Sequence, residues 1–157
     1  MWKHLAGGGL SSVGTDHCPF FYETQKILGR DDFTKMPNGL PGIESRLSLL
    51  HTFGVALGRL SLNRWVEVCC AAPAQIFGLY PKKGSLTPGA DADIVIFDPA
   101  KEVTLSTQVL HEHVDYTPYD GFQLRGWPVM TIVRGKVMVE EGRFVGPRGQ
   151  GKFLVRN

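Results

Sequence analysis

The sequence contains little cysteine, little net charge and no long apolar run. Only three of its 157 residues are cysteines, and their spacing fits neither a disulfide framework nor a zinc finger. The formal net charge of +2 is too small to indicate nucleic acid or an anionic membrane as a partner. No stretch approaches the roughly 18 to 20 apolar residues that span a bilayer, and the first residues lack a signal-peptide pattern. These absences favour a cytoplasmic protein that binds neither nucleic acid nor membrane.

The first half of the chain predicts helices and one long irregular segment. Residues 2–6 resemble a helix end stopped by three glycines, and residues 10–15 are a short strand candidate. Prolines and glycines interrupt residues 18–41, and a connection of this length inside a domain is usually functional. Apolar spacing then predicts helices over 42–60, over 62–71 after the N-cap Ser61, and over 72–77 with Pro73 in the first turn.

The second half changes in character at Pro81 and predicts strands. Residues 92–98 form a run rich in β-branched side chains, and residues 103–105 form a weaker one. Residues 129–133 and 136–139 flank Arg134-Gly135 and predict a hairpin. The pattern therefore indicates an α-rich part followed by a β-rich part.

Asp16 is the first candidate for chemistry, because it directly follows the predicted strand and begins the long loop. Polar groups at the carboxyl ends of barrel strands line active sites, and a carboxylate there can bind a divalent metal ion and accept a proton. The alternative is that Asp16 caps the following turn. His17 faces the opposite side of an extended strand, so both could bind one metal only after a sharp turn. We predict structural roles for His17 and Cys18.

Residues 111–113, His-Glu-His, carry the spacing that places two imidazoles on one side of a strand. They lie in a polar connecting stretch about 95 residues beyond Asp16, and we predict that they are a surface segment. Glu44 begins the predicted helix, where its charge complements the helix dipole. Its expected role is an ion pair that fixes the preceding loop.

Together, several motifs resemble the C-terminal third of the dihydropyrimidinases and D-hydantoinases, which are cyclic amidohydrolases. Asn38 follows Asp16 by 22 residues, which is the spacing of that family. The similar segments cover nearly the whole chain: 13–20, 24–26, 32–35, 37–39, 42–46, 74–81, 83–84, 89–95 and 134–136.

The resemblance implies an α/β fold: the C-terminal part of a metal-dependent (β/α)8 barrel, followed by the C-terminal strands of a small β-sandwich. Residues 1–80 would hold the last strand and helices of the barrel, residues 81–145 the sandwich part, and residues 146–157 a tail. The implied reaction opens the ring of dihydropyrimidines or 5-substituted hydantoins to N-carbamoyl amino acids, as in pyrimidine catabolism. The family forms homotetramers or homodimers around two divalent ions, usually zinc, bridged by a carboxylated lysine.

By the same resemblance, Asp16 binds one metal and acts as the general base, and the main chain of Asn38 hydrogen-bonds the cyclic substrate. The bridging lysine and the metal-binding histidines of the family belong to segments that this chain lacks. We therefore predict a fragment that is inactive alone. Two alternatives stay open: an allantoinase or dihydroorotase type of cyclic amidohydrolase, and a non-catalytic dihydropyrimidinase-like scaffold protein.

Overall fold

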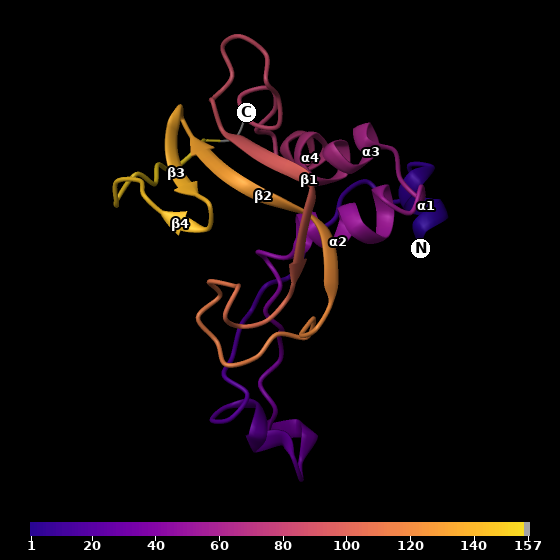
Figure 1. Cartoon of the computed structure of the whole chain (residues 1–157), viewed down its shortest axis with the longest axis vertical. Coiled ribbons are helices and arrows are strands. Elements are labelled where there is room, and N and C mark those ends of the chain that lie inside the picture. Colours follow the sequence, from indigo (N-terminus) through magenta and orange to yellow (C-terminus); the bar gives the residue numbers. More distant parts are fainter. Residues whose placement is uncertain (156–157) are drawn as a thin grey trace.

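The computed structural model describes residues 1–155 of the chain, with short helices on one side of a four-stranded antiparallel sheet (Figure 1). The sheet has the order β1-β2-β3-β4. Its strands are β1 (Ile94–Thr104), β2 (Gln123–Val133), β3 (Lys136–Glu140) and β4 (Arg143–Phe144). The α-rich first half and the β-rich second half predicted from the sequence are both present.

The α- and π-helical segments form two longer runs and one short terminal helix, α1 (Trp2–Ala6). Two short 3-10 helices, Lys26–Gly29 and Phe33–Lys35, lie in the long loop. The first run is α2 (Arg46–Leu50) followed by a π-helical segment (His51–Val55), and it begins later than predicted. The second run is α3 (Leu62–Val66), a π-helical segment (Glu67–Ala71) and α4 (Ala72–Ile76). The predicted N-cap is confirmed, because the Ser61 hydroxyl accepts the Arg64 N–H at 3.1 Å.

The strand predicted over residues 10–15 is wrong. The only bridge near it, within residues 1–155, is an isolated parallel one between His17 and Leu40. A strand requires a hydrogen-bonded neighbour, and the Val13 N–H instead donates to the carbonyl of Val68 at 3.1 Å, in the second helical run.

The two strands predicted over 92–98 and 103–105 form one strand, β1. Its register with β2 is irregular between Asp98 and Glu102, the stretch that contains Pro99, which has no N–H to donate. The hairpin of β2 and β3 is confirmed. Arg134 (φ 48°) and Gly135 (φ 76°) both adopt the left-handed conformation that a tight hairpin turn requires.

The core has two clusters, and His51 lies between the helices and the sheet. The first cluster contains Leu5, Leu60, Trp65, Val68 and Cys69, and the second contains Leu105, Leu124 and Trp127. The His51 ring centroid lies 5.5 Å from that of Trp65 and 5.0 Å from that of Phe97. Its Nδ1 lies 2.6 Å from the Arg125 carbonyl oxygen of β2. This imidazole therefore ties the first helical run to the sheet.

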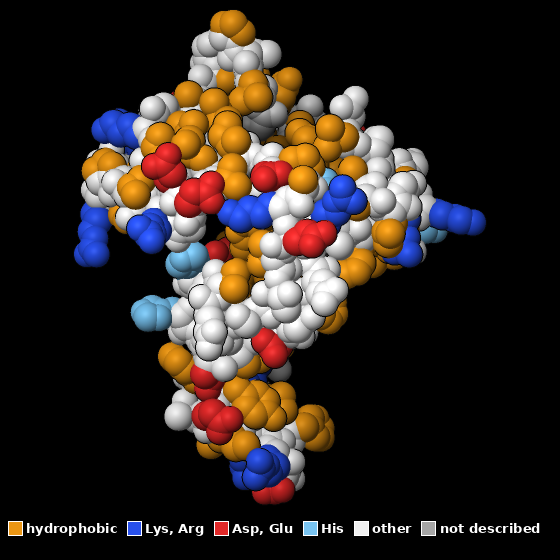
Figure 2. Space-filling model, in the orientation of Figure 1, with side chains coloured by type: hydrophobic (Ala, Val, Ile, Leu, Met, Phe, Trp, Pro, Cys, Tyr) orange, Lys and Arg blue, Asp and Glu red, His pale blue; other side chains and the backbone are white. Residues whose placement is uncertain are grey.

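Much apolar surface stays exposed over α3, α4 and the start of β1, as Figure 2 shows around the upper part of the molecule. The exposed side chains there include Val66, Ile76, Phe77, Leu86, Val95 and Ile96. An open cavity of about 760 Å³ lies between these elements. Contiguous exposed apolar area of this kind is typical of interaction surfaces and ligand-binding grooves.

The helices end before residue 80 and the strands begin after residue 93, which agrees with a change in character near Pro81. The domain limits at residues 80, 81 and 145 stay predictions. Of the predicted tail, residues 156 and 157 lie outside the described part. No helix among the described residues combines the length and the apolar character needed to cross a bilayer.

Candidate functional site

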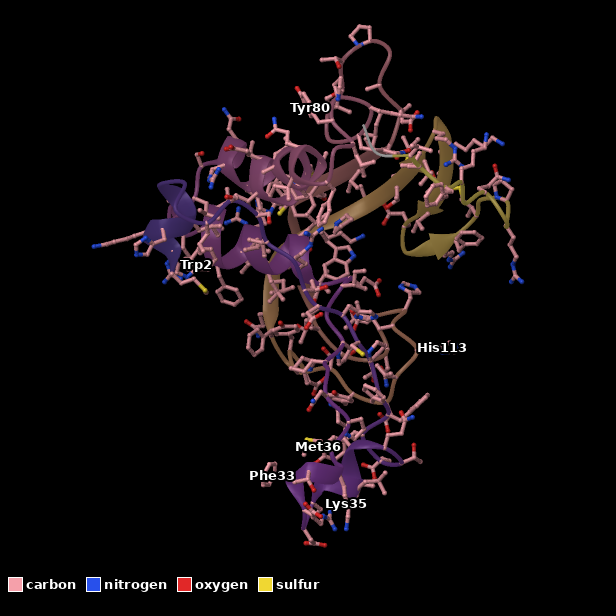
Figure 3. The ribbon with its side chains drawn as sticks, turned by 180° about the vertical axis from the view of Figure 1, so that it is seen from behind. Trp2, Phe33, Lys35, Met36, Tyr80 and His113 are labelled. Atoms are coloured by element: carbon pink, nitrogen blue, oxygen red, sulfur yellow. The ribbon has the colours of Figure 1, made fainter. Side chains whose placement is uncertain are left out.

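The candidate site lies on a long loop that projects from the helices and the sheet (Figure 1). Phe33, Lys35 and Met36 lie at its far tip, as Figure 3 shows. The outgoing and returning limbs run side by side at the His17–Leu40 bridge, and the Cys18 N–H donates to the Leu40 carbonyl at 3.2 Å. This pairing brings Asp16 and Asn38 onto adjacent stretches of chain.

Asp16 stands at a sharp turn with an exposed side chain. Its φ of 49° lies in the left-handed region, which Asp adopts more readily than most residues. Within residues 1–155 its carboxylate accepts no hydrogen bond and forms no ion pair, so the turn-capping alternative finds no support. The carboxylate is free to bind a ligand or to carry a proton.

His17 has a structural role, as the sequence predicts. Its Nδ1 accepts the N–H groups of Gly42 at 3.1 Å and Ile43 at 3.3 Å. An imidazole nitrogen that accepts carries no proton, so the neutral ring holds its proton on Nε2. Neither nitrogen then has a free lone pair for a metal ion. His17 instead joins the two limbs of the loop.

Asn38 belongs to a turn that is held by a buried lysine. Lys26 is 7% exposed, and its Nζ donates to the carbonyls of Pro37 and Gly39, each at 2.5 Å. The same ammonium lies 5.4 Å from the centre of the Phe20 ring. Lys26 lies in the family-like segment 24–26, but the sequence gives no physical reason to expect its burial.

The surface prediction for residues 111–113 holds for His111 and His113, which are exposed, and is wrong for Glu112, whose side chain is 4% exposed. The Glu112 carboxylate accepts the Glu44 N–H at 3.1 Å. In return, the Glu44 carboxylate accepts the His111 N–H and contacts its Nδ1, both at 2.6 Å. Glu44 thus pairs with a residue 67 positions away, and this contact is an ion pair when His111 is protonated.

Asp115 contacts the outgoing limb of the loop. Its carboxylate accepts the backbone N–H groups of Tyr22 at 2.6 Å and Glu23 at 3.0 Å. These bonds, the one from Glu23 first, lower the pKa of Asp115. Residues 111–115 therefore hold the candidate loop through carboxylates at two places.

The Glu44–His111 pair predicts a pH-dependent contribution to stability. The hydrogen bond and charge of Glu44 raise the pKa of His111 above its usual 6.5. A group whose pKa rises on folding stabilises the folded state fully below its unfolded-state pKa, and this contribution is lost as the pH rises through the folded-state pKa. We expect Glu44→Gln to lower the pKa of His111, measured by NMR titration of its imidazole. The stability difference from the wild type should be largest below pH 6.5.

The matched control is Glu102→Gln, which removes an exposed carboxylate from β1. It should leave the titration of His111 unchanged. An unaltered His111 titration in Glu44→Gln would contradict the assignment of the pair.

The described residues do not make a metal centre by themselves. Within residues 1–155, no three His, Cys, Asp or Glu side chains are grouped so that they could hold a metal ion. Asp16 is therefore at most one ligand of a larger set. Burial raises the pKa of the Cys69 thiol to about 11 and also raises that of Cys70, so neither is a reactive thiolate. The 760 Å³ cavity is lined by neither Asp16 nor Asn38.

Residues 2–138 match the model of the amidohydrolase family. The chain belongs to the amidohydrolase family. It is 46% identical to the D-hydantoinase of Streptomyces coelicolor over 156 residues, which are 99% of this chain and 33% of that enzyme.

Two solved structures show that the fold is shared as well as the sequence. A D-hydantoinase (dihydropyrimidinase) from Thermus sp. matches with a TM-score of 0.95 and 48% identity. A dihydropyrimidinase from Brevibacillus agri matches with a TM-score of 0.96 and 44% identity. Each comparison covers 99% of this chain and 34% of the other. This amidohydrolase chain therefore has the α/β fold of the C-terminal part of the barrel enzyme and spans about a third of its relatives' length.

Proposed function

We propose that this chain is the C-terminal third of a cyclic amidohydrolase that opens hydantoin or dihydropyrimidine rings. Water adds to a ring carbonyl, the ring C–N bond breaks, and the product is an N-carbamoyl amino acid. The observation that carries the proposal is the free Asp16 carboxylate beside the turn of Asn38, in a chain that matches hydantoinases along its length. The presence of Asp16 together with the Pro37-Asn38-Gly39 turn favours this proposal over a non-catalytic scaffold.

Asp16 would act on protons. It takes one from the attacking water and delivers it to the ring nitrogen that leaves. The main-chain groups of Asn38 would hold the ring, since a flat ring of alternating N–H and C=O groups suits backbone recognition. Asp16 would also contribute one ligand to a pair of divalent ions, proposed to be zinc, which lower the pKa of bound water and polarise the carbonyl. The other ligands would come from polypeptide outside this chain.

The complete enzyme would be a cytoplasmic homodimer or homotetramer. The exposed apolar side chains on α3, α4 and β1 support contact with further polypeptide, either the remaining two thirds of the enzyme or another subunit.

The test is a chimera in which the first two thirds of the Streptomyces coelicolor D-hydantoinase precede this chain. We expect the purified chimera, supplied with zinc, to convert hydantoin or dihydrouracil to the N-carbamoyl product, measured by chromatography. This chain alone and the first two thirds alone are the controls, and both should be inactive. A folded chimera that opens neither ring would contradict the proposal.

A further inference from the structure

We propose that Lys26 is a positioning residue: its buried ammonium holds the carbonyls on both sides of Asn38 and so presents the Asn38 peptide groups to the substrate. This inference rests on the proposed function, since it assigns a task to the turn that would bind the ring. Lys26 would not touch the substrate, and it would act through the main chain of Asn38.

Burial makes Lys26 unusual. An ammonium is rarely buried without partners, because the loss of hydration is costly unless strong hydrogen bonds replace it. Lys26 is 7% exposed and donates to two carbonyls, and no carboxylate pairs with it within the described residues. Hydrogen bonds from a charged donor are roughly twice as strong as neutral ones. The ammonium is therefore committed to the turn of residues 37–39.

The two bonds determine where the Asn38 N–H points. The Pro37–Asn38 peptide is trans, since the one cis bond of the described chain joins Tyr80 and Pro81. In a trans peptide the C=O and N–H point in opposite directions. Because the Pro37 carbonyl faces the ammonium, the Asn38 N–H faces away from it.

Asn38 is the member of this turn whose main chain stays available. Within residues 1–155 its N–H and its C=O form no hydrogen bond with the protein, and the residue is exposed. The carbonyls before and after it are both bound by Lys26. A ligand with an amide edge can therefore bind an N–H donor whose peptide is held by Lys26, and a C=O acceptor in the peptide between the two held carbonyls. Restricting the turn in this way lowers the entropic cost of binding.

The opposite limb also restricts the turn. A Cβ on Gly39 would lie 2.4 Å from the Cys18 carbonyl oxygen, so the two limbs are in close contact there. Lys26 therefore holds the turn from one side while residues 16–18 hold it from another, and Asp16 stands at the start of that stretch. Loss of the ammonium is expected to loosen the turn, and the distance between the turn and Asp16 should then vary more.

The test compares Lys26→Met, Lys26→Arg and the control Lys35→Met in the chimera. Met keeps the length of the side chain without its donors, and Arg keeps the charge and the donors. Lys35 is an exposed lysine of the same loop, paired with Asp32 at 3.3 Å on the surface. We expect Lys26→Met to lower kcat/KM by about 100-fold, mainly through KM, because misplacement of a binding group by about 1 Å costs this much. Lys26→Arg should recover part of the loss, and Lys35→Met should match the wild type.

A second measurement separates positioning from a general loss of structure. Methylation of one ring nitrogen of hydantoin removes an N–H group that could donate a hydrogen bond to the Asn38 carbonyl. The resulting loss of kcat/KM should be at least about 10-fold in the wild-type chimera for one of the two methylated isomers. It should shrink in Lys26→Met, because the turn no longer distinguishes the two substrates. Unchanged KM and unchanged discrimination in Lys26→Met would overturn the proposal.

Hydrogen exchange measured on the 157-residue chain tests the role of Lys26 without a measurement of catalysis. In Lys26→Met the Cys18 amide, which is bonded to Leu40, should exchange at least about 10-fold faster. The Leu105 amide, bonded to Phe122 in the second core cluster, reports on folding and should not change. If the chimera opens no ring, the proposed function fails, and the Cys18 exchange alone decides whether Lys26 holds the turn. Unchanged exchange at Cys18 would overturn that role.

Discussion

Asp16→Asn is expected to reduce ring opening by the chimera at least about 1,000-fold. Removal of a general base alone costs about 10² to 10⁴ in rate, and a change at a metal ligand adds to this loss. Asn suits the test because it keeps the shape of Asp and also tolerates the left-handed conformation that residue 16 adopts at φ 49°. The backbone at the turn should therefore be preserved. Two quantities are measured: kcat/KM for hydantoin and the metal content of the purified protein.

The matched control for this substitution is Asp31→Asn. Asp31 is an exposed carboxylate of the same loop, near the tip that lies away from the limb pairing. It should retain the activity of the unmodified chimera within about twofold. Activity of Asp16→Asn within 10-fold of the wild type would remove Asp16 from the proposed proton transfer.

Elements defined by local chemistry could be predicted from the sequence. The Ser61 N-cap, the stop of α1 at Gly7 and the hairpin turn at Arg134-Gly135 each depend on residues within four positions of one another. Such signals act through side chains and φ angles that neighbours determine, so the sequence specifies them without the rest of the fold.

The prediction of a strand over residues 10–15 failed, because a strand depends on distant partners as well as on local chemistry. A β-branched composition gives a preference for extended backbone, but strand formation depends on a neighbour. Here the available neighbour is a helical segment, and the Val13 N–H donates to it. In a barrel, the neighbouring strands of such a segment come from other parts of the polypeptide.

At the candidate site, the sequence predicted the candidate reactive group, and the structure revealed the residues that hold the loop around it. Asp16 and Asn38 were proposed from a motif and a spacing. Lys26 and Asp115 were missed because their partners are set by the path of the whole chain: Asp115 binds Tyr22 across 93 residues. The only local signal for Lys26 was its place in a family-like motif, without a physical reason for burial.

The other large effect is expected at Gly126, where β2 meets the first helical run. Its φ is +101°, and an added Cβ would lie 2.4 Å from His51 Nδ1 and 2.7 Å from the Phe97 ring. His51 cannot retreat easily, because it is 5% exposed and packs against Trp65 while its Nδ1 contacts the Arg125 carbonyl. Gly126→Ala therefore combines backbone strain with overpacking, each costing about 1 to 3 kcal/mol. We expect a total loss of about 3 kcal/mol or more in the free energy of unfolding.

Gly121→Ala separates the two contributions. Gly121 has a similar positive φ of +76°, but an added Cβ there meets no atom within 4 Å. Urea unfolding followed by tryptophan fluorescence should give a loss of about 1 kcal/mol for Gly121→Ala, since only the backbone penalty applies. The excess loss in Gly126→Ala then measures the contact of His51 and Phe97 with β2. Equal losses in the two variants would mean that His51 and Phe97 can give way, and that the junction between helices and sheet is loosely packed.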